Sequence, residues 1–222
     1  MRPEQIAGFH GGISHVSIYR YIWSDKSKGG RLWQCLRRKA KHYRQRLTTE
    51  TRGRINDRVS MHKRPSIVDA RKRIGDWEAD TIIGQHHKQA IVMILECRTG
   101  LLKMKRVLKK NAQQVSEAII ERLTPIRLQV KTITSDNGKE FANHKDIKQK
   151  LFSPFFFADA YASWQRGTNE NTNGLIREFL PKGCDLRKVC DDDIQAIEDK
   201  LNNRPRKRLY FKTSSQVFFN IN

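Results

Sequence analysis

The sequence has few cysteines, no long apolar run and too few acids to balance its basic residues. Its four cysteines, Cys35, Cys97, Cys184 and Cys190, form no CxxC pair and have no histidine at zinc-finger spacing. A disulfide framework is therefore not indicated, and free thiols in a reducing cytoplasm are expected. The longest uncharged apolar stretches are short, such as residues 90–95, whereas a membrane helix needs about 20 apolar residues. The N-terminus lacks an apolar segment with a cleavage site, so export is not indicated either.

The shortage of acids is the strongest signal in the composition. The 222 residues include 44 Lys and Arg against 23 Asp and Glu, for a net charge of +21. This excess predicts a polyanionic partner, with nucleic acid first and an anionic membrane surface second. Hydrophobic residues make up 37% of the chain, which is enough for a folded core. Residues 1–73 carry 19 basic and 5 acidic residues, so the positive charge is concentrated in the first third.

That first third is predicted to be a small basic helical region followed by a linker. Residues 13–23 have apolar side chains at helical spacing, with Ser14 as the N-cap. In residues 31–46 a narrow apolar stripe is surrounded by basic side chains, among which are Arg37, Arg38 and Lys39. Contact with DNA phosphates is favoured for this run over a solvated helix, because no acids nearby neutralise it. Residues 47–70 have little periodicity and are predicted to be extended.

From residue 71 onward the pattern indicates an α/β domain. Short runs rich in β-branched and large apolar residues, separated by turn-length breaks, predict strands at 77–84, 89–96, 101–107, 130–135 and 154–158. Helical spacing predicts helices at 111–123, 165–180 and 191–203. Asn111 and Gln114 form a capping-box pattern at the first of these helices. The first three strands should be antiparallel, and the fourth should run parallel to one of them. This order predicts a ribonuclease H-like mixed sheet flanked by helices over residues 71–222.

Three acids stand where packing does not call for a charge. Asp80 lies inside the first strand, and Asp136 directly follows the fourth strand, before an Asn-Gly turn. Glu170 lies near the start of a helix, and Asn173 and Arg177 share its helical face. Each Asp alone is ordinarily a surface or turn residue. Because strand ends converge on one crevice in open α/β sheets, the three carboxylates are expected to lie close together.

A cluster of carboxylates is a natural site for a hard cation. Mg²⁺ and Mn²⁺ take oxygen ligands and bridge carboxylates to phosphates. Two such ions about 3.5–4 Å apart can activate the attacking hydroxyl and stabilise the leaving oxygen of an in-line phosphoryl displacement. This chemistry matches the strongly basic composition, which predicts nucleic acid as the partner.

Four segments, GDWEADTIIG, TITSDNGKEF, SWQRGTNENTNGLIREFLPKG and LNNRPRKRL, resemble the integrase core of bacterial insertion-sequence transposases of the IS-thirty type, in the DDE superfamily. The resemblance covers roughly residues 13–219. It implies a catalytic and metal-binding triad of Asp80, Asp136 and Glu170, with 33 residues between the last two. The implied reaction is hydrolysis of one strand at an element end, followed by attack of the freed 3′-hydroxyl on target DNA. It also implies double-stranded DNA as partner, a homo-oligomer and a location at the bacterial nucleoid in the cytoplasm.

Residues beside the triad have predicted supporting roles. Asn137 and Asn173 are expected to position the nucleophile or a metal-bound water. Trp77 and Trp164 are core aromatics or, alternatively, stack on an end base. Phosphate contact is expected for Arg177, Lys182 and a basic cluster formed by Arg204, Arg206, Lys207 and Arg208.

The sequence also departs from the family pattern. Residues 1–46 match only part of a helix-turn-helix region, so the chain is interpreted as a catalytic core on a truncated binding region. Asp159 stands where the family has an imidazole, and this extra carboxylate is expected to shift ion affinity or to remove a proton-handling group. Two alternatives follow. One is an inactive DNA-binding protein that inhibits the full-length transposase, and the other is a ribonuclease H-like nuclease acting on RNA–DNA hybrids.

Overall fold

The computed structural model describes residues 2–36, 55–85, 89–159 and 167–221. The chain forms two compact units, one of residues 52–202 and one of residues 1–51 with 203–222. The sequence instead predicted three consecutive parts, residues 1–46, 47–70 and 71–222. The end of the expected linker belongs to the sheet unit because its apolar side chains Met61 and Val68 are buried. Residues 203–222 group with the N-terminal helices, where the Gln5 side chain donates to Pro205 O and accepts from Arg204 Nε.

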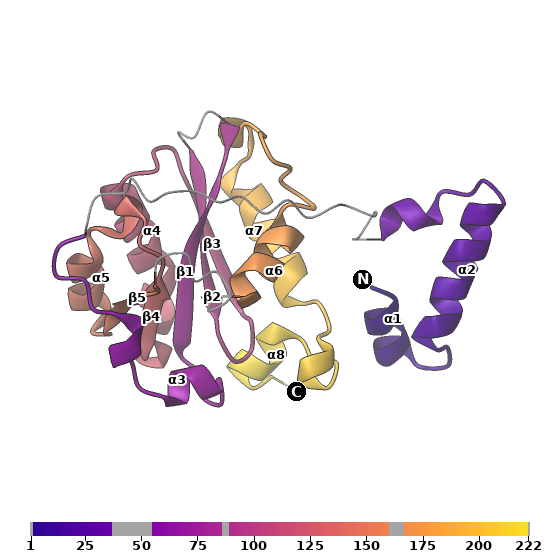
Figure 1. The fold of residues 1–222 in the computed structure, drawn as a ribbon, viewed down its shortest axis with the longest axis horizontal. Coiled ribbons are helices and arrows are strands. Elements are labelled where there is room, and N and C mark those ends of the chain that lie inside the picture. The colour runs from indigo at the N-terminus through magenta and orange to yellow at the C-terminus, as the bar shows by residue number, and fades with distance from the viewer. Residues whose placement is uncertain (1, 37–54, 86–88, 160–166, 222) are drawn as a thin grey trace. The chain divides into compact units, whose positions relative to one another are not determined.

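The sheet unit contains a five-stranded sheet with helices on both faces (Figure 1). Its strands are β1 (Asp76–Ile83), β2 (Ala90–Glu96), β3 (Leu102–Val107), β4 (Thr132–Ser135) and β5 (Phe155–Phe157). Its α-helices are α3 (Ile67–Ala70), α4 (Ala112–Leu123), α5 (His144–Leu151), α6 (Gly167–Ile176) and α7 (Asp191–Asn202). Its 3₁₀ turns are η2 (Met61–Lys63), η4 (Thr124–Gln129), η5 (Lys139–Phe141) and η7 (Leu186–Lys188).

The strand order is β3-β2-β1-β4-β5. The first three strands are antiparallel neighbours, and β4 and β5 run parallel to β1. Both predictions are confirmed, since short turns join the antiparallel strands and helical crossovers join the parallel ones. The parallel pairing brings the ends of β1 and β4 to the same side of the sheet.

The two faces of the sheet are covered by different helices. Figure 1 shows α4 and α5 on one face and α6 and α7 on the other. Alternate strand residues such as Ile82, Met93 and Leu102 form one buried cluster with side chains of α6 and α7. Because side chains alternate between faces, Asp80 lies on the same face of β1 as Ile82. The candidate site therefore lies on the α6 face.

The edge of the sheet at β3 is closed by side chains of α7. Asn202 accepts from Leu102 N and donates to Leu102 O, both at 2.8 Å, and Glu198 Oε2 accepts from Met104 N at 2.6 Å. At the opposite edge, Phe157 N donates to Val59 O at 2.8 Å. Side chains and a neighbouring segment thus occupy edge groups that would otherwise be open to pairing with another strand.

The capping box predicted at the start of α4 has two hydrogen bonds, of which the structure forms the first and replaces the second. Asn111 Oδ1 accepts from Gln114 N at 2.9 Å, as expected. The Gln114 side chain, however, accepts from Lys109 N rather than from Asn111 N. The reason is that Asn111 N already donates to Lys109 O. The helix ends at Leu123, before Pro125, and η4 follows.

The second unit is helical. It contains α1 (Pro3–His10), α2 (His15–Ser27), η1 (Leu32–Cys35), η8 (Lys207–Leu209) and α8 (Ser214–Phe219). Ser14 caps α2 as predicted, accepting from Ser17 N at 3.1 Å. Gly8 is required by close packing, because a Cβ there would lie 2.0 Å from the Phe211 ring. None of the helices in the described ranges is both long and apolar enough to span a membrane.

Candidate active site

Asp80 lies on β1, and Asp136 directly follows β4, the neighbouring parallel strand. In the β1–β4 register, Asp76 lies opposite Thr132. The paired register ends at Glu78 and Thr134, and extending it by two residues would set Asp136 opposite Asp80. Neighbouring strands lie about 4.8 Å apart, so that alignment would put the two carboxylates near each other. Thr132 Oγ1 donates to Asp76 Oδ1 at 2.7 Å, which shows that this pair shares a face.

Local hydrogen bonds orient both carboxylates. Asp80 Oδ1 accepts from Thr81 N at 2.8 Å, and its Oδ2 accepts from Asn173 Nδ2 at 3.1 Å. Asp136 Oδ1 accepts from Gly138 N at 2.9 Å, which is the Asx turn expected from the Asp-Asn-Gly sequence. Both acids are half-buried. Each therefore keeps part of its carboxylate accessible while its direction is fixed.

Helix α6 is anchored to β1 by Arg177 as well as by Asn173. The Arg177 guanidinium donates to Ile83 O at 2.7 Å, and more weakly to Leu180 O and Pro181 O at 3.4 and 3.3 Å. Burial lowers the pKa of Arg177 below its ordinary value. The sequence suggested a DNA phosphate as its partner. The structure shows its guanidinium, one residue past the end of α6, donating to backbone carbonyls, one of them at the end of β1.

Glu170 lies one helical turn before Asn173, and its side chain is exposed. Three residues of α-helix rise about 4.5 Å, so Glu170 lies close along α6 to the contact with Asp80. Within the described ranges, no group of three or more His, Cys, Asp or Glu side chains is gathered closely enough to hold a metal ion. The structure thus brings Asp80 together with Asn173, and it leaves Glu170 on the neighbouring turn of α6.

The oxygen atoms around Asp80 fit a hard divalent cation. Asn173 Oδ1 is buried and has no hydrogen-bond partner in the described part of the chain. A buried acceptor without a partner costs about 1–3 kcal/mol, which a ligand at that oxygen would offset. Amide and carboxylate oxygens are the ligands that Mg²⁺ and Mn²⁺ take. Asp80, Asp136 and Asn173 therefore offer the right donors, and Glu170 offers a further one from the adjacent turn.

Sequence reasoning did not single out Glu140, whose side chain contacts that of Thr81, the residue after Asp80. Glu140 Oε1 accepts from Thr81 Oγ1 at 3.0 Å and pairs with Lys110 Nζ at 2.7 Å. Burial acts to raise the pKa of Glu140, but the hydrogen bonds from Lys110, the backbone and Thr81 outweigh it and hold the pKa below its ordinary value. The only sequence signal for Glu140 is its position four residues after Asp136.

Asn137 bridges the ends of two strands. Its Nδ2 donates to Ala158 O at 2.7 Å, and its Oδ1 accepts from Arg58 Nη1 at 2.7 Å. Asp159, the departure from the family pattern, lies 2.6 Å from His62 Nε2 through its Oδ2. Arg58 and His62 come from the stretch predicted to be a linker, so no local pattern marked them.

The remaining predicted residues are distributed as follows. Trp77 is fully buried, which confirms the core reading and excludes stacking on a base. Lys182 and Lys207 are exposed. Arg206 is half-buried, and burial together with Arg208 and Arg204 lowers its pKa to about 10. Predictions for Arg37, Arg38, Lys39 and Trp164 lie outside the described residues.

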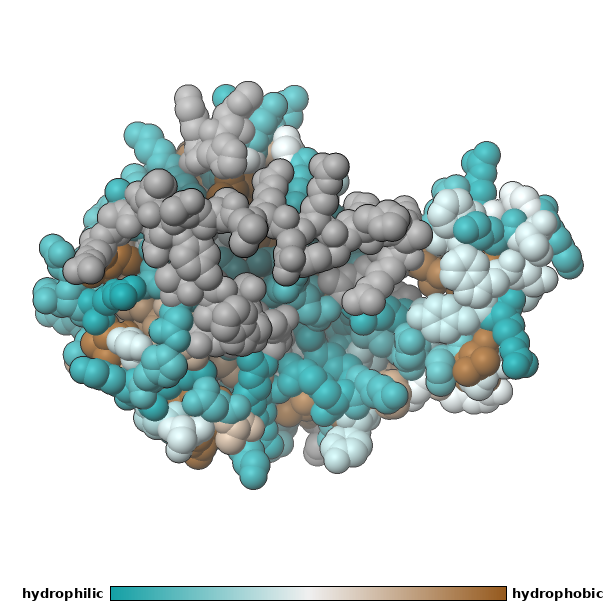
Figure 2. Space-filling model, in the orientation of Figure 1, coloured by the Kyte–Doolittle hydropathy of each residue, from teal (hydrophilic) through white to brown (hydrophobic). Residues whose placement is uncertain are grey.

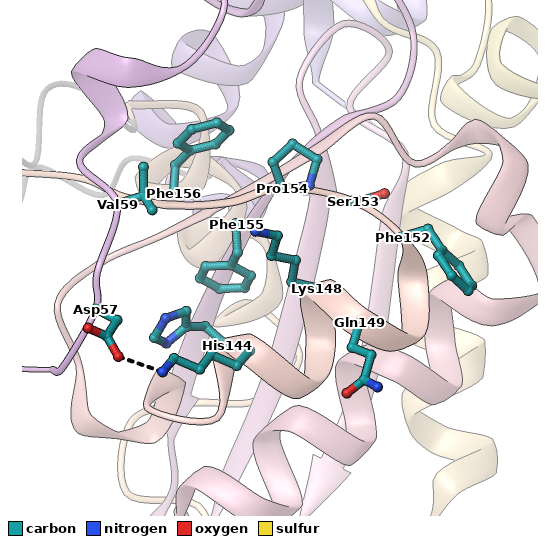
Figure 3. A pocket seen from close by; sticks show the side chains of 11 residues that line it. Asp57, Val59, His144, Lys148, Gln149, Phe152, Ser153, Pro154, Phe155 and Phe156 are labelled. Carbon is teal, nitrogen blue, oxygen red and sulfur yellow. Dashed lines mark hydrogen bonds and ion pairs between the residues drawn. The ribbon is translucent and has the colours of Figure 1, made fainter.

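A cavity of about 830 Å³ lies beside β5, apart from the paired acids. Its lining includes Phe155, Lys148 and Val59, and Figure 3 shows Asp57 reaching toward α5, where it pairs with Lys145. Neither Asp80 nor Asp136 lines this cavity. The visible described surface is mostly hydrophilic, with apolar residues in separate patches (Figure 2).

Comparison with known proteins identifies the family. No protein-family model matches the chain. The chain is 45% identical over 225 residues to the transposase for insertion sequence element IS4351 of Bacteroides fragilis, covering 99% of this chain and 69% of that protein. The chain belongs to the insertion-sequence transposases. The resemblance inferred from the four sequence segments is thereby confirmed.

More distant relatives of this transposase agree. It is 34% identical over 216 residues to the transposase for IS1086 of Cupriavidus metallidurans, covering 94% of this chain and 63% of that protein. It is 31% identical over 231 residues to the transposase InsI for insertion sequence element IS30A of Escherichia coli, covering 97% of this chain and 60% of that protein. The transposase chain thus spans less than two thirds of the length of these two relatives.

The fold comparison gives an integrase core. The catalytic core domain of BIV integrase matches with a TM-score of 0.51 and 19% identity, covering 65% of the transposase chain and 93% of that domain. At this identity the likeness establishes the fold alone. The prediction of a ribonuclease H-like mixed sheet flanked by helices is confirmed.

Proposed function

We propose that this transposase catalyses metal-dependent cleavage and transfer of DNA strands at the ends of an insertion sequence. The observation that supports the proposal is the parallel pairing of β1 and β4, whose register, extended by two residues, would set Asp136 opposite Asp80. The relatives, which are transposases for insertion sequence elements, support the same reaction class. The proposed partners are the element ends and target DNA, on the bacterial nucleoid in the cytoplasm.

In this proposal Asp80, Asp136 and Glu170 hold Mg²⁺ or Mn²⁺, with two ions at full occupancy, and Asn173 Oδ1 supplies a further oxygen. When bound, such ions lower the pKa of an attacking hydroxyl and neutralise charge on the scissile phosphate. Asn173 Nδ2 orients Asp80, and Gly138 N orients Asp136. Arg177 keeps α6, and therefore Glu170, beside β1. The protein thus sets the carboxylates in place before DNA arrives.

DNA contact is assigned to basic residues outside the paired acids. Lys182 and Lys207 are exposed and suited to phosphates, and Arg37, Arg38 and Lys39 are proposed to act likewise. Residues 1–46 are proposed to be a partial helix-turn-helix region. A homo-oligomer is proposed, because transposition joins two element ends.

The test is a strand-transfer assay with the full chain, end-containing DNA and Mg²⁺ or Mn²⁺. Asp136→Asn should abolish nicked and joined products. Asp146→Asn is the matched control, because Asp146 is an exposed acid on α5. Products from both wild type and Asp136→Asn, or from neither while DNA is still bound, would refute the proposal. The second result would favour the inactive DNA-binding alternative, and nicking without joining would favour a nuclease.

A further inference from the structure

A short segment before the sheet is tied to both loops that leave the parallel strands. Residues 57–62, termed here the strap, run beside β5. Ser60 pairs with Phe157 in a parallel bridge, and Val59 O accepts from Phe157 N at 2.8 Å. At the far end of the strap, Asp57 pairs with Lys145 of α5 (Figure 3). The strap is therefore fixed to the sheet edge at its middle and to α5 at its start.

Two strap side chains extend from this edge toward the site. Arg58 Nη1 donates to Asn137 Oδ1 at 2.7 Å, and His62 lies 2.6 Å from Asp159 Oδ2. Asn137 follows β4 by two residues, and Asp159 follows β5 by two residues. The strap thus contacts the loop after β4 and the loop after β5.

The contact of Arg58 leads directly to one of the paired acids. Asn137 is the residue after Asp136, and its amide is held at both ends, by Arg58 and by Ala158 O. The next amide, Gly138 N, holds the Asp136 carboxylate. Arg58 therefore fixes the middle of the three-residue turn whose first side chain is Asp136.

We propose that Arg58 is a positioning residue that acts through Asn137 to hold the Asp136 turn in its working geometry, an inference that rests on the proposed function. An exposed arginine in a basic protein would ordinarily be assigned to a DNA phosphate. Arg58 instead donates a 2.7 Å hydrogen bond to the uncharged amide of Asn137, which fits a positioning role. The strap, which precedes the sheet in sequence, is then part of the site.

The experiment compares Arg58→Gln with Lys63→Gln in the full chain. Lys63 is also exposed and lies just past the strap, so both variants remove one charge from the same region. Loss of a hydrogen bond to a charged donor should lower the strand-transfer rate at saturating DNA about tenfold in Arg58→Gln. Lys63→Gln should keep the wild-type rate. DNA affinity and its salt dependence should be the same in both variants.

Two further measurements separate positioning from phosphate contact. If Arg58 acts through Asn137, the double variant Arg58→Gln/Asn137→Ala should be no slower than Asn137→Ala alone. If Arg58 contacted a phosphate, the slope of the logarithm of the DNA-binding constant against the logarithm of the salt concentration would become shallower by about 0.9 in Arg58→Gln only. Independent rate losses in the double variant, or that change in slope, would overturn the inference.

Hydrogen exchange tests the inference without activity. Amide exchange in the peptide covering 136–141 should be faster in Arg58→Gln than in wild type or Lys63→Gln, because Gly138 N loses its fixed acceptor. Unchanged exchange would overturn the inference even if the enzyme is active. An inactive wild type would refute the proposed function, while the exchange result would still decide the role of Arg58.

Discussion

Arg177 offers the sharpest test of how α6 is held against the sheet. Its guanidinium makes one short hydrogen bond, 2.7 Å to Ile83 O, and two long ones at 3.3 and 3.4 Å. A hydrogen bond from a charged donor contributes about 1.5–3 kcal/mol net, and the long contacts add little. Replacement by Met keeps the aliphatic stem and removes the donors. We therefore expect Arg177→Met to lower the free energy of unfolding by about 2 kcal/mol.

Thermal unfolding followed by circular dichroism measures this loss. For a domain of this size, 1 kcal/mol shifts Tm by about 2–4 °C, so Arg177→Met should lower Tm by about 4–8 °C. Lys182→Met is the matched control, because Lys182 is exposed and should lose DNA affinity without losing stability. An unchanged Tm together with weaker DNA binding in Arg177→Met would show that the arginine contacts phosphate instead.

Three other perturbations have expected outcomes. Asn202→Ala removes both partners of the Leu102 backbone at the sheet edge and should cost about 2–4 kcal/mol in urea unfolding; a loss below about 1 kcal/mol would mean that water replaces the amide. Asn111→Ala should cost about 1 kcal/mol through the lost cap of α4, and a Tm equal to wild type would contradict that role. Lys110→Met should raise the pKa of Glu140. Because the folded pKa of Glu140 lies below its ordinary value of 4.5, the pairing stabilises the protein above that pH and loses its effect as pH falls through the folded pKa. Melting curves at pH 7 and in strong acid should therefore differ between wild type and variant only at pH 7.

Local patterns were sufficient for the secondary structure of the sheet unit. Alternating and continuous apolar runs predicted all five strands, and the 3.6-residue spacing of Val115, Ile119 and Leu123 predicted the buried face of α4. The Asn-Gly turn after Asp136 and the capping role of Asn111 also follow from neighbouring residues alone. Such features depend on contacts within a few residues, which a sequence displays directly.

Long-range partners were not predictable in the same way. Arg58 and Asn137 are 79 positions apart, and their contact exists only because residues 57–62 lie along β5. The backbone partners of Arg177 depend on where α6 meets β1, and no local pattern near Arg177 indicated them. The unit boundaries differed for a related reason, because a few buried apolar side chains between residues 55 and 70 outweigh an otherwise unpatterned composition.

The proposed placement of Asp80 beside Asp136 can be tested directly by anomalous diffraction from crystals of the full chain soaked in Mn²⁺. We predict manganese between the two carboxylates, with Asn173 Oδ1 as a ligand and the Glu170 side chain turned toward the ion. Manganese bound elsewhere, with no peak at Asp80, would contradict the proposed site.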